Sequence, residues 1–105
     1  MDITLEQWHE QLKNDADAVI LDVRTQEEVD EGHIAECLHI DIQNPTGFME
    51  EVQKLDPDKA YYVYCRSGGR SKQACMVLSS LGFNEVYNLE GGYEGWLEGL
   101  DTLED

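Results

Sequence analysis

The sequence is poor in basic residues, in proline and in paired cysteines. Its 105 residues hold seven Lys and Arg against 23 Asp and Glu, which gives a formal net charge of −16. This excess of negative charge repels nucleic acids and anionic membrane surfaces, so we predict neither as a partner. The three cysteines have no spacing typical of a disulfide framework or a zinc site, which indicates a reducing compartment.

Long apolar runs are also missing from the chain. No stretch is long and apolar enough to span a bilayer, and the N-terminus lacks the basic and apolar regions of a signal peptide. We therefore predict a cytoplasmic protein. The length suits a single domain over residues 1–105 with one core, and nothing in the sequence requires more than a monomer. The scattered acidic residues favour a solvated surface, and a docking face for a basic protein partner stays open as an alternative.

Two capping signatures mark the beginnings of helices. Thr4 is followed by Gln7, and Thr25 by Glu28, at the spacing of a capping box. The first predicts an amphipathic helix that packs on a sheet edge, and the second predicts a short acidic helix over residues 26–31. Further helices are expected after the turn at Asn44-Pro45, after Gly69 up to a stop at Gly82, and as a short final helix with Trp96.

Short apolar runs rich in β-branched or aromatic residues alternate with these helices. The expected strands are residues 18–21, 37–40, 61–64 and 85–89. Strands that alternate with helices through short connections predict an α/β fold, with a central, mostly parallel sheet covered by helices on both faces. Ligands of such sheets bind beyond the carboxyl ends of the strands.

The main candidate site lies at one of these strand ends. Cys65 follows the predicted strand and begins a short glycine-containing loop that opens a helix; the loop residues after it are Arg66, Ser67, Gly68, Gly69, Arg70 and Ser71. The backbone N–H groups of such a loop can point together at one sulfur and form a nest for an anion. The two glycines permit a tight turn with positive φ and close approach of a ligand to the backbone.

Positive charge is concentrated in the same loop. Arg66, Arg70 and Lys72 are three of the seven basic residues of the chain and lie within seven consecutive positions. A helix N-terminus and neighbouring cations can lower a cysteine pKa from about 8.5 to roughly 3.5–7.5, which leaves a thiolate at neutral pH. We therefore predict that Cys65 is a nucleophile. The alternative, a structural cysteine before an ordinary turn, is disfavoured by the combination of glycines and arginines.

The sequence resembles a known family, the single-domain rhodaneses, over nearly its whole length. The resemblance is carried by Leu21-Asp22-Val23-Arg24, Gly32-His33-Ile34, the loop from Val63 to Ser71, and Leu89-Glu90-Gly91-Gly92 with Trp96. The loop is the most specific element, and its two arginines resemble those of the thiosulfate-preferring branch. Ala35-Glu36-Cys37 departs from the Pro-Gly-Ala that many members have there.

The resemblance implies a rhodanese-like fold and a sulfurtransferase in which Cys65 cycles between thiolate and persulfide. Residues 66–71 would bind the substrate and the persulfide, with Arg66 and Arg70 on an anionic donor. The hydroxyls of Ser67 and Ser71 would either donate hydrogen bonds to sulfur or cap the helix, with capping favoured for Ser71. It implies no metal and no organic cofactor. The implied partners are a small-molecule sulfur donor and acceptor, with a sulfur-relay or thioredoxin-like protein as a further option.

Two other functions are compatible with parts of the pattern. Cysteine phosphatases and arsenate reductases also use a strand, an anion-binding loop and a helix, but they need an arginine six positions after the cysteine. Here that position is Ser71, and Arg70 falls one place short. The second alternative is an inactive or regulatory binding module on the same scaffold, which the presence of Cys65 with both arginines disfavours.

Several other residues receive structural interpretations. Asp22 and Arg24 are expected to form an ion pair, with a reach toward the loop as the alternative, and His33 is expected to be a hydrogen-bonded packing residue. Cys37 and Cys75 are expected to be small buried hydrophobes, and a resolving role for Cys75 stays open. The remaining expectations are a tight turn at Gly91 and Gly92 beside the site and a core position for Trp96.

Overall fold

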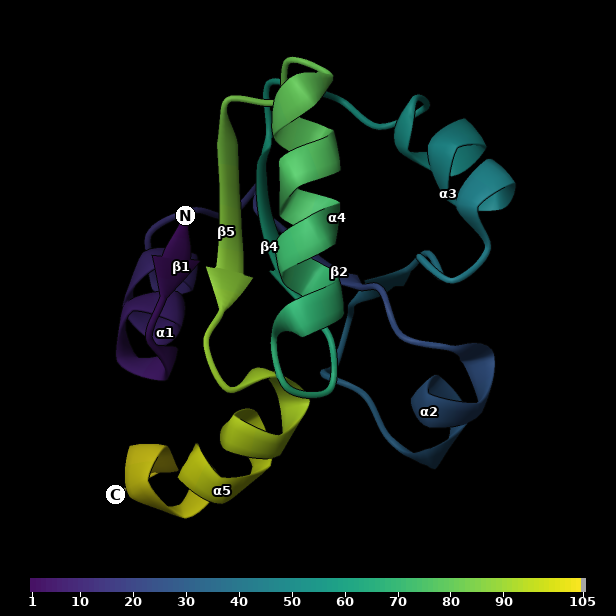
Figure 1. The fold of residues 1–105 in the computed structure, drawn as a ribbon. Coiled ribbons are helices and arrows are strands. Elements are labelled where there is room, and N and C mark those ends of the chain that lie inside the picture. The colour runs from purple at the N-terminus through teal and green to yellow at the C-terminus, as the bar shows by residue number, and fades with distance from the viewer. Residues whose placement is uncertain (105) are drawn as a thin grey trace.

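A five-stranded sheet forms the centre of the molecule, in the order β1-β5-β4-β2-β3 (Figure 1). The computed structural model describes residues 1–104 and the side chains of residues 1–99. The strands are β1 (Asp2–Ile3), β2 (Val19–Asp22), β3 (Leu38–His39), β4 (Ala60–Tyr64) and β5 (Glu85–Leu89). Every neighbouring pair in this order runs parallel, so the sheet is parallel across the part of the chain that the structure describes.

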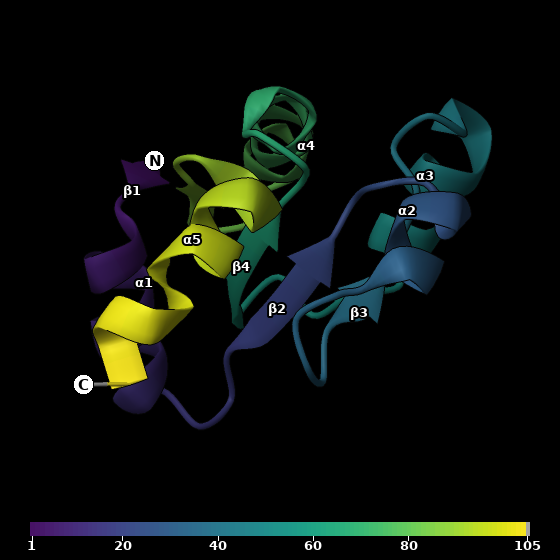
Figure 2. The same ribbon diagram turned by 90° about the horizontal axis from the view of Figure 1, so that it is seen from below.

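Helices cover both faces of the sheet (Figure 2). They are α1 (Leu5–Lys13), α2 (Gln26–Glu31), α3 (Pro45–Val52), α4 (Gly69–Ser80) and α5 (Gly92–Glu104). Successive side chains of β4 point to opposite faces: Val63 packs with residues of α3 and α4, whereas Tyr62 packs with residues of α1 and α5. The predicted α/β fold with helices on both faces is confirmed.

Both predicted capping boxes are present. The Thr4 hydroxyl accepts a hydrogen bond from the Gln7 amide at 3.2 Å, and the Gln7 side chain accepts one from the Thr4 amide at 2.9 Å. The Thr25 hydroxyl and the Glu28 carboxylate make the same reciprocal pair at 3.3 and 3.2 Å. As a result α2 spans the predicted residues 26–31.

The structure differs from the sequence-based expectation in three elements. Strand β1 was not predicted, because its two residues have no pattern of their own and are strand only by pairing with β5. The final helix α5 has 13 residues and is not short. Strand β3 has only two residues, Leu38–His39, where a strand over residues 37–40 was expected.

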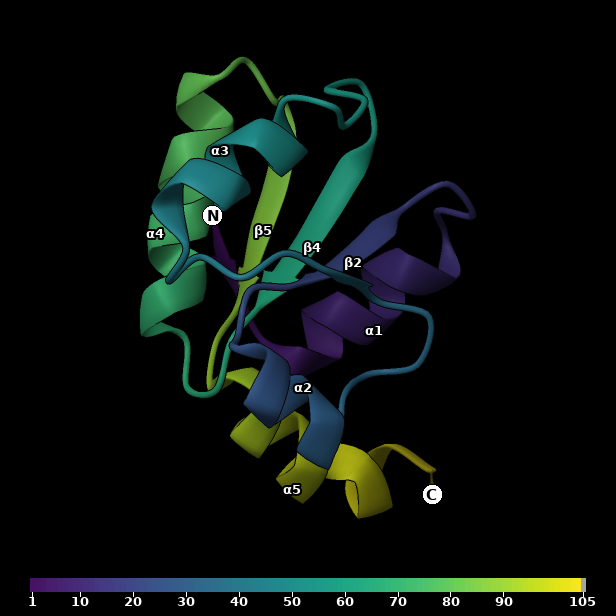
Figure 3. The ribbon, with the colours of Figure 1, turned by 90° about the vertical axis from the view of Figure 1, so that its right-hand side faces the viewer.

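The elements that surround the candidate loop lie at one end of the molecule. Strands β4 and β5 point toward this end, where α2 and α5 also lie (Figures 1 and 3). The loop that connects β4 to α4 turns there, beyond the carboxyl end of the middle strand of the sheet. This is the edge at which parallel α/β sheets bind their ligands.

Candidate active site

The Cys65 sulfur is held within the loop between β4 and α4. Gly68, in the left-handed conformation with φ 116°, is the N-cap of α4, and its backbone N–H donates to the Cys65 sulfur at 3.1 Å. The hydroxyl of Ser71, in the first turn of the helix, lies 3.4 Å from the same sulfur. The capping role expected for Ser71 is wrong, because Gly68 is the N-cap and no side chain in the described part of the chain caps α4. The sulfur therefore faces the loop amides and the start of the helix, in the arrangement of an anion nest.

The environment of Cys65 favours its ionised form. Burial works against ionisation, and the residue is 1 % exposed. Hydrogen bonds from the Ser71 hydroxyl and from the backbone amides of Ser71, Gly68 and Ser67 outweigh this cost and hold the pKa of the Cys65 thiol below its ordinary value. The thiolate is thus stabilised mainly by hydrogen-bond dipoles.

Arg70 belongs to a second interaction that sequence reasoning did not find. Its guanidinium forms a bidentate ion pair with Glu28 of α2, at 2.7 and 2.9 Å, in a partly buried position. This hydrogen bonding lowers the pKa of Glu28 to about 2 and raises that of Arg70. Glu28 had a local signal as a capping residue, but nothing in the sequence indicated a partner 42 positions away.

The other two cations of the loop segment also lie near carboxylates. The Arg66 side chain is 67 % exposed and lies 3.7 Å from Glu94 of α5, and Lys72 lies 3.9 Å from Asp2 of β1. The sequence predicted that these cations would stabilise the thiolate. In the structure each faces a carboxylate, so hydrogen bonds take the larger part of that role.

Asp22 and Arg24 form the predicted structural ion pair. Both residues are buried, and the Arg24 guanidinium donates to the Asp22 carboxylate at 2.7 Å and to the Gly32 carbonyl at 2.7 Å. The guanidinium also lies over the Tyr93 ring, 4.4 Å from its centre. The pair therefore connects the end of β2 to the end of α2 and to the beginning of α5, and fixes these segments beside the loop.

Helix α5 contacts the backbone of the loop directly. The Tyr93 amide donates to the Cys65 carbonyl at 2.8 Å, and the Glu94 amide donates to the Arg66 carbonyl at 3.1 Å. Gly92 has φ 56°, and a Cβ atom there would lie 2.6 Å from both carbonyl oxygens. The predicted tight turn beside the site is confirmed, and it requires glycine for conformation and for space.

A chain of polar side chains extends from the buried sulfur to the exposed edge strand of the sheet. The Ser71 hydroxyl lies within hydrogen-bond distance of the Asn88 side-chain oxygen, and the Asn88 nitrogen donates to the Asp2 carboxylate at 3.0 Å. Sequence reasoning missed Asn88 and Asp2. Asn88 looked like one residue of an ordinary strand, and Asp2 meets it only because β1 pairs with β5.

A pocket opens beside the loop, between α2 and α5. Its volume is about 360 Å³, and it is lined by Arg24, Glu28, Glu31, Gly32, Arg66, Tyr93, Glu94 and Leu97. The lining carries two guanidinium groups and three carboxylates, so the mouth of the site has charges of both signs.

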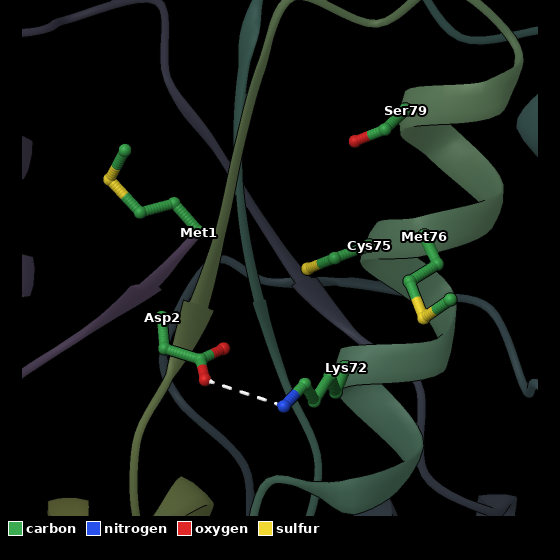
Figure 4. A pocket seen from close by; sticks show the side chains of 6 residues that line it. All are labelled: Met1, Asp2, Lys72, Cys75, Met76 and Ser79. Carbon is green, nitrogen blue, oxygen red and sulfur yellow. Dashed lines mark ion pairs between the residues drawn. The ribbon is translucent and has the colours of Figure 1, made fainter.

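The other cysteines lie outside this arrangement. Cys75 lies on the side of α4 that faces the core, as predicted, and is 5 % exposed; burial raises its pKa to about 12. It borders a separate pocket of about 470 Å³ lined by Met1, Asp2, Lys72, Cys75, Met76 and Ser79 (Figure 4). Cys37 is half-buried, and its sulfur accepts a hydrogen bond from the Tyr64 hydroxyl at 3.6 Å; burial raises its pKa as well.

Two smaller expectations concern His33 and Trp96. His33 makes a local hydrogen-bond contact with the Ile34 carbonyl at 3.1 Å, as expected for a packing residue. Trp96 is half-buried, stacks on Tyr93 and packs against the cluster around Trp8, so it belongs to the edge of the core. Among residues 1–99, whose side chains the structure describes, no group of His, Cys, Asp or Glu is arranged to hold a metal ion. No helix within residues 1–104 is both long and apolar enough to cross a membrane.

Fold and site together define an α/β protein that holds one thiol sulfur beyond the middle strand of a parallel sheet. The family described as Rhodanese-like domain matches residues 5–99. Thiosulfate sulfurtransferase GlpE from Coxiella burnetii is 40 % identical over 92 residues, which cover 88 % of this chain and 81 % of that protein. The putative sulfurtransferase YtwF from Bacillus subtilis is 40 % identical over 87 residues, which cover 83 % of this chain and 81 % of YtwF.

Solved structures give the same result. A rhodanese-related protein from Thermoplasma volcanium has a TM-score of 0.78 and 36 % identity, over 92 % of this chain and 90 % of that one. The human single-domain sulfurtransferase TSTD1 has a TM-score of 0.75 and 27 % identity, over 92 % and 95 % of the two chains. The chain belongs to the rhodanese-like domain family.

Proposed function

We propose that this chain is a sulfurtransferase that moves a sulfane sulfur from a donor such as thiosulfate to a thiophilic acceptor through a persulfide on Cys65. The observation that carries the proposal is the sulfur environment, in which the Gly68 amide at 3.1 Å and the Ser71 hydroxyl at 3.4 Å favour a thiolate. The relative named thiosulfate sulfurtransferase, 40 % identical over 92 residues, supports the same activity here.

In the first half-reaction the Cys65 thiolate attacks the outer sulfur of thiosulfate. A bond forms between the two sulfurs, the sulfur–sulfur bond of thiosulfate breaks, and sulfite leaves with the bonding electron pair. The persulfide on Cys65 carries one negative charge, as the thiolate did, so no proton has to move. A general base is therefore unnecessary, and the loop amides of residues 67–71 stabilise charge on either sulfur.

In the second half-reaction an acceptor such as cyanide or a thiolate attacks the outer sulfur of the persulfide. The bond to the Cys65 sulfur breaks, and Cys65 leaves as the thiolate with which the cycle began. A lowered thiol pKa helps this step, because a weaker base is a better leaving group.

The two loop arginines have different parts in donor binding. Arg70 is held by two hydrogen bonds to Glu28 and supplies a fixed cation at the start of α4. Arg66 is largely exposed, and its contact with Glu94 at 3.7 Å is weak enough to be exchanged for an incoming oxyanion. Gly69 leaves space for a ligand beside the loop, since a Cβ atom there would have no neighbour within 4 Å.

A cysteine phosphatase is the weaker alternative. Its loop needs a guanidinium at the sixth position after the cysteine to bind a phosphoryl group, and Ser71 occupies that position. The Ser71 hydroxyl contacts the Cys65 sulfur, and Arg70 is paired with Glu28. An inactive regulatory module would show no turnover, so a measurement of thiocyanate formation distinguishes it from an enzyme.

The remaining parts of the proposal concern the setting of the reaction. The substrates are a small-molecule donor and acceptor, and a thioredoxin-like or sulfur-relay protein is a further acceptor of suitable chemistry. The protein acts as one domain over residues 1–105, as a monomer and in the cytoplasm. These points rest on composition and on the family resemblance.

The decisive experiment measures thiocyanate formation from thiosulfate and cyanide. Wild-type protein should turn over, and Cys65→Ala should lose all activity while its melting curve stays cooperative. Cys37→Ala is the matched control, since this half-buried cysteine lies outside the loop and its loss should leave turnover unchanged. Mass spectrometry of wild-type protein after thiosulfate alone should show one added sulfur on Cys65. Turnover by Cys65→Ala would refute the proposal, and inactive wild-type protein would favour the regulatory module.

A further inference from the structure

The contacts of the Ser71 hydroxyl exceed the number of protons it can donate. Its oxygen lies 3.4 Å from the Cys65 sulfur, 3.1 Å from the Gly68 carbonyl and within hydrogen-bond distance of the Asn88 side-chain oxygen. A hydroxyl carries one proton, and all three neighbours can accept it. The Gly68 carbonyl already accepts from the Lys72 amide at 3.1 Å and from the Asn88 nitrogen at 3.3 Å. The competition for the proton is therefore between the sulfur and Asn88.

The orientation of the Asn88 amide is fixed by its surroundings. Its nitrogen lies 3.0 Å from the Asp2 carboxylate and 3.3 Å from the Gly68 carbonyl, and both of these groups only accept hydrogen bonds. A rotation by 180° would place the Asn88 oxygen against the Asp2 carboxylate, so the rotated form is unfavourable. The Asn88 oxygen consequently faces Ser71 as an acceptor.

This geometry ties the Ser71 proton to the charge on the sulfur. While Cys65 is protonated, Ser71 donates to Asn88 and every acceptor has a donor. When Cys65 ionises, the Ser71 proton turns to the sulfur and the Asn88 oxygen loses its donor. Asn88 is 4 % exposed and Ser71 is fully buried, so water has little access to replace that donor.

This inference rests on the proposed role of Cys65. We propose that Asp2 and Asn88 are positioning residues: Asp2 orients the Asn88 amide, and Asn88 determines whether the Ser71 hydroxyl donates its proton to the Cys65 sulfur. By holding the Asn88 oxygen toward Ser71, Asp2 opposes ionisation of Cys65. The function of such opposition is to prevent excessive stabilisation of the thiolate. A thiolate loses nucleophilicity as its pKa falls, and the best attacking thiol has a pKa near the working pH.

Other charged and titratable groups near the sulfur also affect the ionisation of Cys65. Arg70 and Cys75, both on α4, interact electrostatically with Cys65. Lys72 lies 3.9 Å from Asp2 across the pocket mouth in Figure 4, and Glu28 is paired with Arg70. Arg70, Cys75, Lys72 and Glu28 all stay unchanged in the experiment.

The test is a double-mutant cycle on Asp2 and Ser71, with the pH dependence of Cys65 alkylation by iodoacetamide as the readout. Trypsin cleavage after Lys59 and Arg66 releases a peptide in which Cys65 is the sole cysteine, so mass spectrometry reports on this thiol alone. Asp2→Ala should lower the alkylation pKa by roughly half to one unit. Only the longer contact with the Gly68 carbonyl, at 3.3 Å, then holds the Asn88 amide, so Asn88 can rotate more easily and donate to Ser71. Ser71→Ala should raise it, since the sulfur loses its hydroxyl donor.

The informative comparison is the effect of Asp2→Ala in the two backgrounds. In Ser71→Ala protein the same Asp2 substitution should leave the alkylation pKa unchanged, because the group through which it acts is gone. An equal shift in both backgrounds would mean a direct charge effect of Asp2 and would overturn the proposal, as would no shift in the wild-type background.

A second variant covers the case in which Asp2→Ala loosens β1. Asn88→Leu removes the competing acceptor while filling a similar volume, and it should also lower the alkylation pKa of Cys65. An unchanged or raised pKa would refute the proposal. Alkylation requires no sulfur transfer, so the result is independent of whether the chain turns over thiosulfate.

Discussion

The thiol of Cys65 shows how much of a cysteine's reactivity depends on dipoles close to the sulfur. The polar groups that hydrogen-bond to the sulfur are the Ser71 hydroxyl and the amides of Ser71, Gly68 and Ser67; all are neutral, and together they overcome the cost of burial. Arg70 adds a cation at longer range, and Glu28 offsets much of its charge. The number of positive residues in a loop therefore predicts the stabilisation of the thiolate poorly, because the carboxylates that pair with those residues lie elsewhere in the sequence.

At the same scale, Glu28 makes stability depend on pH. The ion pair with Arg70 lowers the pKa of Glu28 from an ordinary value of 4.5 to about 2. Because the folded-state pKa is the lower one, this stabilisation is complete above pH 4.5 and is lost as the pH falls toward 2. We predict that Glu28→Gln, which keeps the cap, costs about 1–2 kcal/mol of unfolding free energy at pH 6.

Urea unfolding of wild-type protein and Glu28→Gln at several pH values tests this. The difference between the two proteins should shrink below pH 4.5 and vanish near pH 2. Glu27→Gln, which removes an exposed carboxylate from the first turn of the same helix, serves as a control for the general effect of acid on α2. A difference that stays constant with pH would show that the carboxylate charge contributes nothing to stability.

Among the elements, α5 is the one on which the loop backbone depends. Gly92→Ala would place a methyl group 2.6 Å from the carbonyl oxygens of Cys65 and Arg66, at a φ of 56°. We predict a loss of about 1–3 kcal/mol of stability and a roughly tenfold or larger loss of kcat/KM, because loop and helix must separate.

A matched control lies three residues further along α5. A Cβ atom at Gly95 would lie 3.8 Å from the Glu90 carbonyl, an ordinary contact. Gly95→Ala should keep full activity and raise stability by about 0.5–1 kcal/mol through helix propensity. Thermal melts and thiosulfate kinetics of both variants would check this, and equal behaviour of the two would contradict the close-packing argument.

The elements also show which parts of the fold can be predicted from local sequence. The capping boxes at Thr4 and Thr25 are local, and they correctly predicted how α1 and α2 begin. Strand β5 was predicted at residues 85–89, where the structure has it, because its apolar pattern is complete within the segment. Strand β1 depends on a partner 86 residues away, which no local pattern indicates.

The same distinction applies to the site. Residues 65–71 could be proposed as a candidate site from the sequence because they are consecutive and share one chemistry. Glu28, Asn88 and Asp2 were missed as site residues because each reaches the loop from another element, through contacts that exist only in the folded chain.

At the scale of the whole molecule, the site combines a local arrangement of cations with a net charge of −16. The two act in opposite directions on an anionic donor, since the loop attracts it and the bulk of the surface repels it. Each cation of the loop segment lies near a carboxylate: Arg70 near Glu28, Arg66 near Glu94 and Lys72 near Asp2. These pairs weaken the local attraction, so repulsion by the whole surface should control the approach of an anion.

This balance predicts the direction of a salt effect. Raising the ionic strength from about 0.01 to 0.15 M shortens the screening length from roughly 30 to 8 Å and removes most of the long-range repulsion. The rate of Cys65 alkylation by iodoacetate should therefore rise by about twofold or more, while the rate with neutral iodoacetamide should stay constant. The kcat/KM for thiosulfate, a dianion, should rise more steeply than the iodoacetate rate. A fall in the iodoacetate rate with added salt would show that the loop cations dominate the field, despite the carboxylates beside them.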